Sequence, residues 1–168
     1  MKASIYSLVI ISIVLLLASC TSRTPELPVT EEYDDEQLAL QALVAFLDSL
    51  HNGRYEEAAQ FYGGTYEIMI DHNPSIDPSN QAALMNNACT INGAECLEVK
   101  SAGADRTIST TEFSFKVEFM NADGTLFVRG PCCGGNETDS PSQSLFIFTV
   151  VKEENGKFLV MDMPPYMP

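Results

Sequence analysis

Two hydrophobic periodicities divide the chain into a helical part and a sheet-forming part. From Glu36 onward, apolar residues recur at intervals of three and four, which is the spacing of one helix face. Asp34 and Gln37 have the spacing of a capping box, and Asn52-Gly53 is a typical helix stop. The pattern therefore predicts a helix that begins near residue 36, ends before Asn52 and buries one apolar face. That face is formed by Leu40, Leu43, Val44, Leu47 and Leu50.

Shorter patterns predict two more helices and one short strand in the segment that follows. Alanines and aromatic residues at 55–62 predict a helix, which Gly63-Gly64 ends. The apolar run at 65–70 predicts a short strand. Ser79 is a candidate cap for a third helix that runs to about residue 87.

The remainder of the chain alternates with period two, which predicts β-strands. Asp123-Gly124 and Asn155-Gly156 are typical hairpin turns between these strands. The run at 145–151 is apolar on both faces, so it predicts a central strand that is covered on both sides. Helices followed by antiparallel hairpins predict an α+β fold, with the N-terminal helices packed on the sheet as a single domain over 36–168. The predicted strands are 97–100, 113–119, 126–129, 145–151 and 158–163.

The first twenty residues have the pattern of an export signal. One lysine, Lys2, precedes an apolar run at 5–17, which is shorter than the ~20 residues of a membrane-spanning helix. The run ends at Leu17-Ala18-Ser19-Cys20, which resembles the lipobox of bacterial lipoproteins. The resemblance implies a signal peptide at 1–19, cleavage before Cys20 and a lipid on Cys20. The alternative is an ordinary secretory signal that happens to contain a cysteine.

The segment that follows predicts a tether. Residues 20–35 are rich in acids and contain two prolines, a composition that keeps a chain extended. We therefore expect a domain anchored to the cell membrane or the outer membrane through Cys20 and facing the extracytoplasmic side. The formal charge of −14 argues against a nucleic-acid partner, because phosphate binding depends on clustered Lys and Arg.

One stretch resembles a known superfamily. Residues 46–59, FLDSLHNGRYEEAA, are similar to the opening of nuclear transport factor 2-like domains in exported bacterial lipoproteins, and the likeness extends over 36–166. It implies a cystatin-like cone, in which a curved antiparallel sheet wraps a helix and often leaves a pocket between them. Some relatives with this fold are enzymes such as ketosteroid isomerase, which uses an Asp base and an acidic hydrogen-bond donor. The cluster of that chemical type here is Tyr62, Tyr66, Asp71 and His72, and we assign these pocket candidates no catalytic role.

Four cysteines remain after Cys20, and an even number in an exported chain predicts two disulfides. They are Cys89, Cys96, Cys132 and Cys133. Crossed pairings between the first two and the last two avoid a vicinal bridge and are favoured, while a local Cys89–Cys96 bond stays possible. The alternative is a soft-metal or redox site at Cys132-Cys133, but it lacks a Cys-x-x-Cys motif and a nearby His.

We predict no resident metal or cofactor. Oxygen-bearing side chains alternate at 71–77 as in a calcium loop, but Ile76 and Ala82 stand where an EF-hand needs Gly and Glu. The first functional hypothesis is a non-enzymatic, tethered domain that binds a small apolar ligand or an envelope protein. The alternative is a pocket enzyme of the isomerase or hydrolase type. A third hypothesis is a module that dimerises through its sheet.

Overall fold

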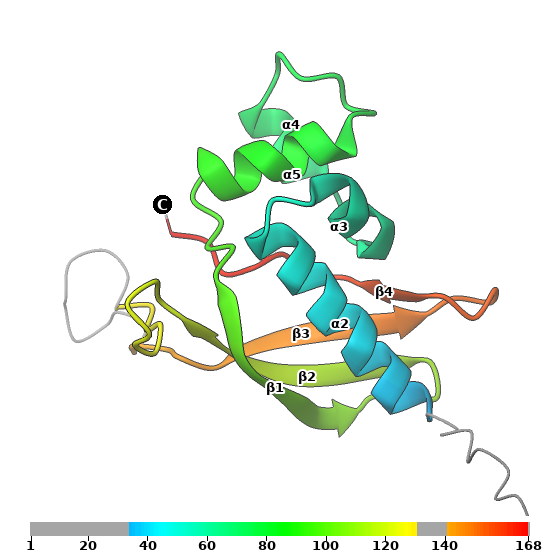
Figure 1. Ribbon diagram of the computed structural model, residues 1–168. Helices are drawn as coiled ribbons and strands as arrows, with labels where there is room; N and C mark the ends of the chain where they lie inside the picture. Colours follow the sequence, from blue (N-terminus) through cyan, green and yellow to red (C-terminus); the bar gives the residue numbers. More distant parts are fainter. Residues whose placement is uncertain (1–33, 131–140, 168) are drawn as a thin grey trace, which may run out of the picture. The chain divides into compact units, whose positions relative to one another are not determined.

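The chain is α+β, as the sequence predicts. The computed structural model describes residues 34–130 and 141–167 (Figure 1). The predicted signal peptide, Cys20, most of the tether, and Cys132-Cys133 lie outside the described residues. Within them, no helix is long and apolar enough to cross a membrane. The elements are α2 (Asp35–His51), α3 (Tyr55–Phe61), α4 (Glu67–His72), α5 (Gln81–Thr90), β1 (Glu98–Thr107), β2 (Glu112–Met120), β3 (Phe146–Lys152) and β4 (Phe158–Val160).

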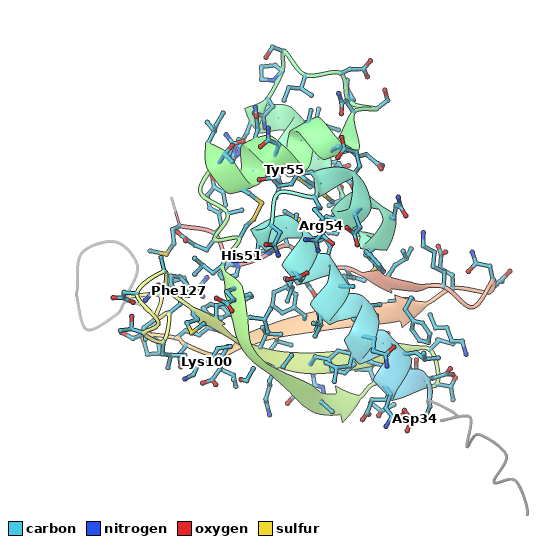
Figure 2. All side chains as sticks on the ribbon, in the orientation of Figure 1. Asp34, His51, Arg54, Tyr55, Lys100 and Phe127 are labelled. Atoms are coloured by element: carbon cyan, nitrogen blue, oxygen red, sulfur yellow. A yellow bond between two sulfur atoms is a disulfide. The ribbon has the colours of Figure 1, made fainter. Side chains whose placement is uncertain are left out.

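Helix α2 begins and ends where the sequence predicts. The Asp34 carboxylate accepts from the Gln37 amide at 2.8 Å and the Gln37 side chain accepts from the Asp34 amide, which completes the capping box. Asn52 caps the other end, and Gly53 follows with φ of +71°. Beyond this turn, Arg54 forms 2.7 Å ion pairs with one acid on α2 and one on α3 (Figure 2).

The apolar face of α2 is rotated relative to the prediction. Leu43, Leu47 and Leu50 are buried as expected, but Val44 is 38% exposed. Ala39, Ala42 and Phe46 are buried in its place, and the Phe46 ring stacks on Tyr62. Figure 1 shows α2 lying across one face of the sheet, with α3, α4 and α5 near its C-terminal end.

The four strands form one antiparallel sheet in the order β1-β2-β3-β4, with its apolar residues on the face toward α2. Paired positions share a face, so Phe115 on β2 and its partner Phe148 on β3 are both at most 1% exposed. The expectation that β3 is covered on both sides is wrong, since Ile147 is 48% exposed on the opposite face. That second face also carries the ion pair between Asp105 and Lys116.

Two short segments differ from their predictions. Residues 67–70 of the strand expected at 65–70 belong to α4 instead, and the Thr65 hydroxyl accepts from the Glu67 amide at its start. A short apolar run fits both periodicities, and packing against α5 decides between them. Among the described residues, the segment expected as a strand at 126–129 makes two isolated bridges, Met120–Leu126 and Arg129–Gln143, in place of a continuous ladder. The third predicted helix is capped by Asn80 rather than Ser79.

The favoured crossed disulfide pairing is wrong, because Cys89 and Cys96 are bonded to each other with their Cα atoms 5.5 Å apart. Cys89 lies in the last turn of α5, and the chain folds back so that the Ala94 amide donates to the Ala88 carbonyl at 2.9 Å. The turn passes through Gly93, whose φ is +84°. This local reversal brings the two cysteines within bonding distance. Their separation of seven residues does not by itself determine whether they pair with each other.

Candidate functional site

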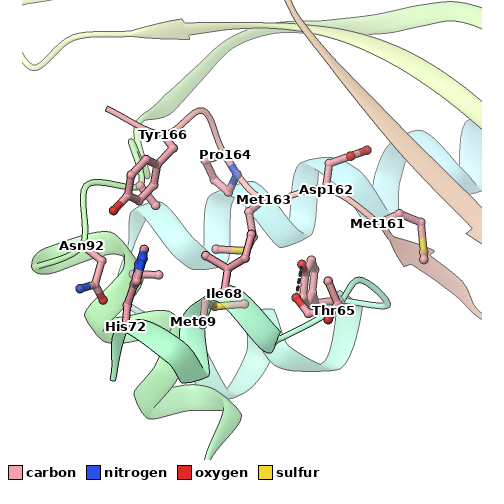
Figure 3. A pocket seen from close by; sticks show the side chains of 13 residues that line it. Thr65, Ile68, Met69, His72, Asn92, Met161, Asp162, Met163, Pro164 and Tyr166 are labelled. Carbon is pink, nitrogen blue, oxygen red and sulfur yellow. Dashed lines mark hydrogen bonds between the residues drawn. The ribbon is translucent and has the colours of Figure 1, made fainter. Parts of the chain in front are cut away.

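An apolar cavity of about 430 Å³ lies between α4, the end of α5 with its following loop, and the C-terminal segment 161–166 (Figure 3). Its size and mainly apolar lining are those of a small-molecule site. The cavity does not lie between α2 and the sheet, because that layer is filled by tightly packed aromatic and aliphatic side chains. The lining residues are Tyr62, Thr65, Ile68, Met69, His72, Ala88, Asn92, Ala94, Met161, Asp162, Met163, Pro164 and Tyr166.

Close backbone contacts at glycines hold both ends of the C-terminal wall. At one end the Gly63 amide donates to the Val160 carbonyl at 2.9 Å, and a Cβ on Gly63 would lie 2.8 Å from that of Leu159. At the other end the Met167 amide donates to the Gly93 carbonyl at 2.8 Å. A Cβ on Gly93 would collide with the Met167 carbonyl, so only glycine permits this approach. The wall is therefore fixed by backbone geometry at both ends.

Tyr62 lines the cavity and also packs against the core. Its ring is stacked on Phe46 at 5.8 Å between centroids, and its hydroxyl donates to the Thr65 carbonyl at 3.1 Å. Burial, and to a smaller extent the negative charge of Asp162, raises the pKa of Tyr62. The Tyr62 hydroxyl is thus partnered and remains protonated at neutral pH.

Of the four pocket candidates from the sequence, Tyr62 and His72 line the cavity and the other two do not. Tyr66 packs edge-on against Tyr62, with ring centroids 5.1 Å apart. The Tyr66 hydroxyl is buried and has no hydrogen-bond partner among the described residues. Burial, with a smaller effect of Tyr62, raises the pKa of Tyr66 to about 12. Asp71 is exposed on α4 and lies outside the cavity lining.

No sequence pattern predicts that Asn92, residues 161–164 and Tyr166 line the cavity. Met161 and Met163 belong to a Met-x-Met-Pro sequence, whose pattern predicts only the end of the last strand. The cavity also holds Asp162, which is half-buried and accepts from the Thr149 amide at 2.6 Å. Figure 3 shows its carboxylate turned away from the side chains of Met161 and Met163. Asp162 therefore ties the C-terminal segment to β3.

A chain of three side-chain amides connects α4 to α5 and the loop after it. Asn73, which is 6% exposed, donates from Nδ2 to the Met69 carbonyl at 2.7 Å and to Asn92 Oδ1 at 2.9 Å. Its Oδ1 accepts from Asn87 Nδ2 at 2.9 Å. This network fixes the position and orientation of Asn92 at the rim of the cavity.

A second hollow, of about 450 Å³, adjoins the cavity and is open and mainly polar. It is lined by His72, Ile91, Asn92, Gly93, Tyr166 and Met167. Three of these residues, His72, Asn92 and Tyr166, also line the apolar cavity. They form a rim where an apolar compartment meets a polar one, which we call the rim triad.

The chain matches no protein-family model, no curated protein and no solved structure. Within residues 34–130 and 141–167, no group of three or more His, Cys, Asp or Glu side chains is arranged to hold a metal ion. The features that bear on function are therefore the cavity and the N-terminal sequence.

Proposed function

We propose that this protein is an exported, membrane-anchored lipoprotein whose folded domain binds a small apolar ligand. The observation that carries the ligand-binding part is the apolar cavity between α4, the α5–β1 loop and the C-terminal segment. The anchor rests on Leu17-Ala18-Ser19-Cys20, with residues 1–19 as signal peptide and 20–35 as tether. The acidic chain, with a formal charge of −14, gives no support to a nucleic-acid partner.

The likeness to nuclear transport factor 2-like domains belongs to the same proposal. A long helix across one face of a four-stranded antiparallel sheet supports it. The cavity, however, lies beside the short helices rather than between α2 and the sheet. If the chain is a cone-like domain of this type, its binding site is displaced to one end of the helical layer.

Binding is favoured over catalysis by how the polar groups around the cavity are used. The Tyr62 hydroxyl donates to a backbone carbonyl, and the Asp162 carboxylate accepts from a backbone amide. A pocket enzyme of the isomerase type would need such an acid and such a donor to face the substrate. Here both are committed to holding the walls in place, so a binding role fits the geometry better.

The binding proposal is tested with the full chain carrying Cys20→Ser, so that no acyl chain of the protein itself competes for the site. The probe is 1-aminoanthracene, an uncharged fluorophore whose emission rises in apolar surroundings. Ala88 is 5% exposed and lines the cavity, so Ala88→Leu should fill part of the space and weaken probe binding at least fivefold. Ala82→Leu, at a half-buried position on α5 outside the cavity lining, is the matched control and should leave binding unchanged.

No saturable binding of the probe to folded protein would refute the cavity as a ligand site, and so would equal binding by the two leucine variants. Circular dichroism and thermal unfolding of each variant establish that it is folded. The anchor is tested separately by mass spectrometry of the protein expressed in a bacterial host. A diacylglyceryl thioether on an N-terminal Cys20 is expected, whereas an intact leader or an unmodified cysteine would contradict it.

A further inference from the structure

We propose that the ligand is a single-chain amphiphile with a hydrogen-bond-accepting head group, namely a fatty carboxylate. Its tail would occupy the apolar cavity, and its carboxylate would lie at the rim triad of His72, Asn92 and Tyr166. This inference rests on the proposed ligand-binding function and adds the chemical class of the ligand.

The first argument is the arrangement of the two hollows. The apolar cavity is lined mainly by apolar side chains, and the one carboxylate in its lining, Asp162, accepts from the Thr149 amide, whereas the adjoining hollow is open and mainly polar. Both are lined by His72, Asn92 and Tyr166, and the His72 and Tyr166 rings are 6.4 Å apart. Figure 3 shows these three side chains together at one end of the cavity, away from Met161 and Thr65 at the other. A molecule that is apolar along its length and polar at one end matches this division.

The second argument is the orientation of the Asn92 amide, which the neighbouring carbonyl determines. The Met69 carbonyl can only accept a hydrogen bond, so the Asn73 atom that faces it must be Nδ2. That same nitrogen lies 2.9 Å from Asn92, so the Asn92 atom that faces it must be the acceptor, Oδ1. The two N–H groups of Asn92 Nδ2 are then left to point elsewhere, and they donate no hydrogen bond to a described residue.

The rim triad therefore offers hydrogen-bond donors to a ligand. Asn92 contributes an amide N–H, His72 a ring N–H and Tyr166 a hydroxyl. Neither hollow is lined by a lysine or an arginine, so the head group would be held by hydrogen bonds rather than by an ion pair. A carboxylate has two acceptor oxygens and no donor, and hydrogen bonds to a charged acceptor are stronger than those between neutral groups.

The net negative charge of the chain opposes binding of an anion. Tighter binding of an anion than of a cation would therefore have to come from local contacts at the rim triad. The formal charge of −14 favours cations at long range, but at ~0.15 M salt this effect fades beyond about 8 Å. Tail burial would supply most of the affinity, with about a fourfold gain for each methylene until the cavity is full. The head group would then decide between amphiphiles of equal length.

The first test compares two amphiphiles of the same chain length on the full chain carrying Cys20→Ser. Laurate and dodecyltrimethylammonium each displace 1-aminoanthracene at near-physiological salt, at concentrations below those at which they form micelles. The inference expects laurate to bind at least tenfold more tightly than the cation. Equal affinities, or tighter binding of the cation, would overturn the inference. The net negative charge of the chain by itself predicts tighter binding of the cation.

The second test changes the donor. Asn92→Asp keeps an oxygen that can accept from Asn73 but replaces the two N–H groups with a negatively charged oxygen. We expect laurate affinity to fall tenfold or more while binding of the cationic amphiphile is unchanged or stronger. Asn86→Asp, at an exposed position on α5 near the loop that carries Asn92, makes the same change in net charge and should alter neither affinity. Loss of laurate affinity in both variants, or in neither, would contradict the role of Asn92.

The two proposals fail in different ways. If 1-aminoanthracene does not bind, the cavity is not a ligand site and both proposals are refuted. If the fluorophore binds and is displaced by amphiphiles regardless of head group, the apolar site stands and the fatty carboxylate is refuted. Tyr166→Phe, which removes only a hydroxyl at a 42% exposed position, gives an independent measure and should weaken laurate several-fold.

Discussion

The contact between Gly93 and the C-terminal segment provides a test of how the cavity wall is held. Gly93 has φ of +84° and its carbonyl accepts from the Met167 amide at 2.8 Å. An alanine there would adopt a left-handed backbone conformation and would place its Cβ against the Met167 carbonyl. Gly124 is the matched control, because it has φ of +82° and nothing lies within 4 Å of a Cβ built on it.

The expected magnitude follows from these two environments. Left-handed backbone costs alanine about 1–2 kcal/mol, and the stiffer unfolded chain offsets about 0.4–1 kcal/mol of this at both sites. Gly93→Ala must also displace the C-terminal segment and break the Met167 hydrogen bond, and it strains the adjacent Ala94–Tyr166 bridge. One or two lost hydrogen bonds at about 0.5–1.5 kcal/mol each give a difference of about 1–2 kcal/mol between the variants.

Equilibrium urea unfolding of the two variants measures this difference. With a slope of about 2 kcal/mol per molar urea, the midpoint of Gly93→Ala should lie about 0.5–1 M below that of Gly124→Ala. Gly93→Ala should also weaken 1-aminoanthracene binding, because Asn92 and Tyr166 would shift with the wall, while Gly124→Ala should not. Equal midpoints and equal probe affinities in the two variants would refute the claim that this approach holds the cavity wall.

Three further outcomes are expected. Phe148→Ala should destabilise the fold by about 3–5 kcal/mol and Ile147→Ala by less than about 1 kcal/mol in chemical unfolding, because only the first faces α2. Replacing Cys89 and Cys96 by serine should cost about 2.5 kcal/mol for a loop of this length, and peptide mapping without reductant should show the two cysteines linked to each other, whereas a crossed link would contradict the fold. The lysine partner on β2 lowers the pKa of Asp105, so this carboxylate contributes stability above its unfolded pKa of about 3.9 that is lost as pH falls through the lower folded value. Unfolding midpoints measured from pH 5 to pH 2 should therefore fall less steeply for Asp105→Asn than for the wild type, and parallel curves would count against the ion pair.

Local sequence signals were reliable where a few neighbouring residues determine the geometry. The capping box at Asp34 and Gln37 is confirmed, and so is the helix stop at Asn52-Gly53. Gly124 and Gly156 have positive φ at the two predicted hairpin turns. Alternation at 113–119 correctly identified the buried side of β2, because side chains of a strand must alternate between its faces.

The rest depended on contacts between residues that are distant in the sequence. Val44 and Phe46 are both apolar, and only the position of the sheet decides which of them is buried. The six residues of α4 are too few for periodicity to separate helix from strand, and α5 settles the outcome. Two members of the site were within reach of sequence reasoning, since Tyr62 and His72 are the right chemical type.

By itself, the sequence determined the fold class, the main helix with its caps, and the two central strands β2 and β3, because hydrophobic period and turn chemistry are local properties. The cavity was decided by the tertiary structure alone. It exists because close approaches at Gly63 and Gly93 bring the C-terminal segment against α4 and the α5–β1 loop. Residues about a hundred positions apart then line one cavity, and the amide of Asn92, in the turn after α5, is oriented through Asn73 by the Met69 carbonyl of α4. No periodicity or motif in the sequence predicts these tertiary contacts, because they depend on how helices and strands pack once they have formed.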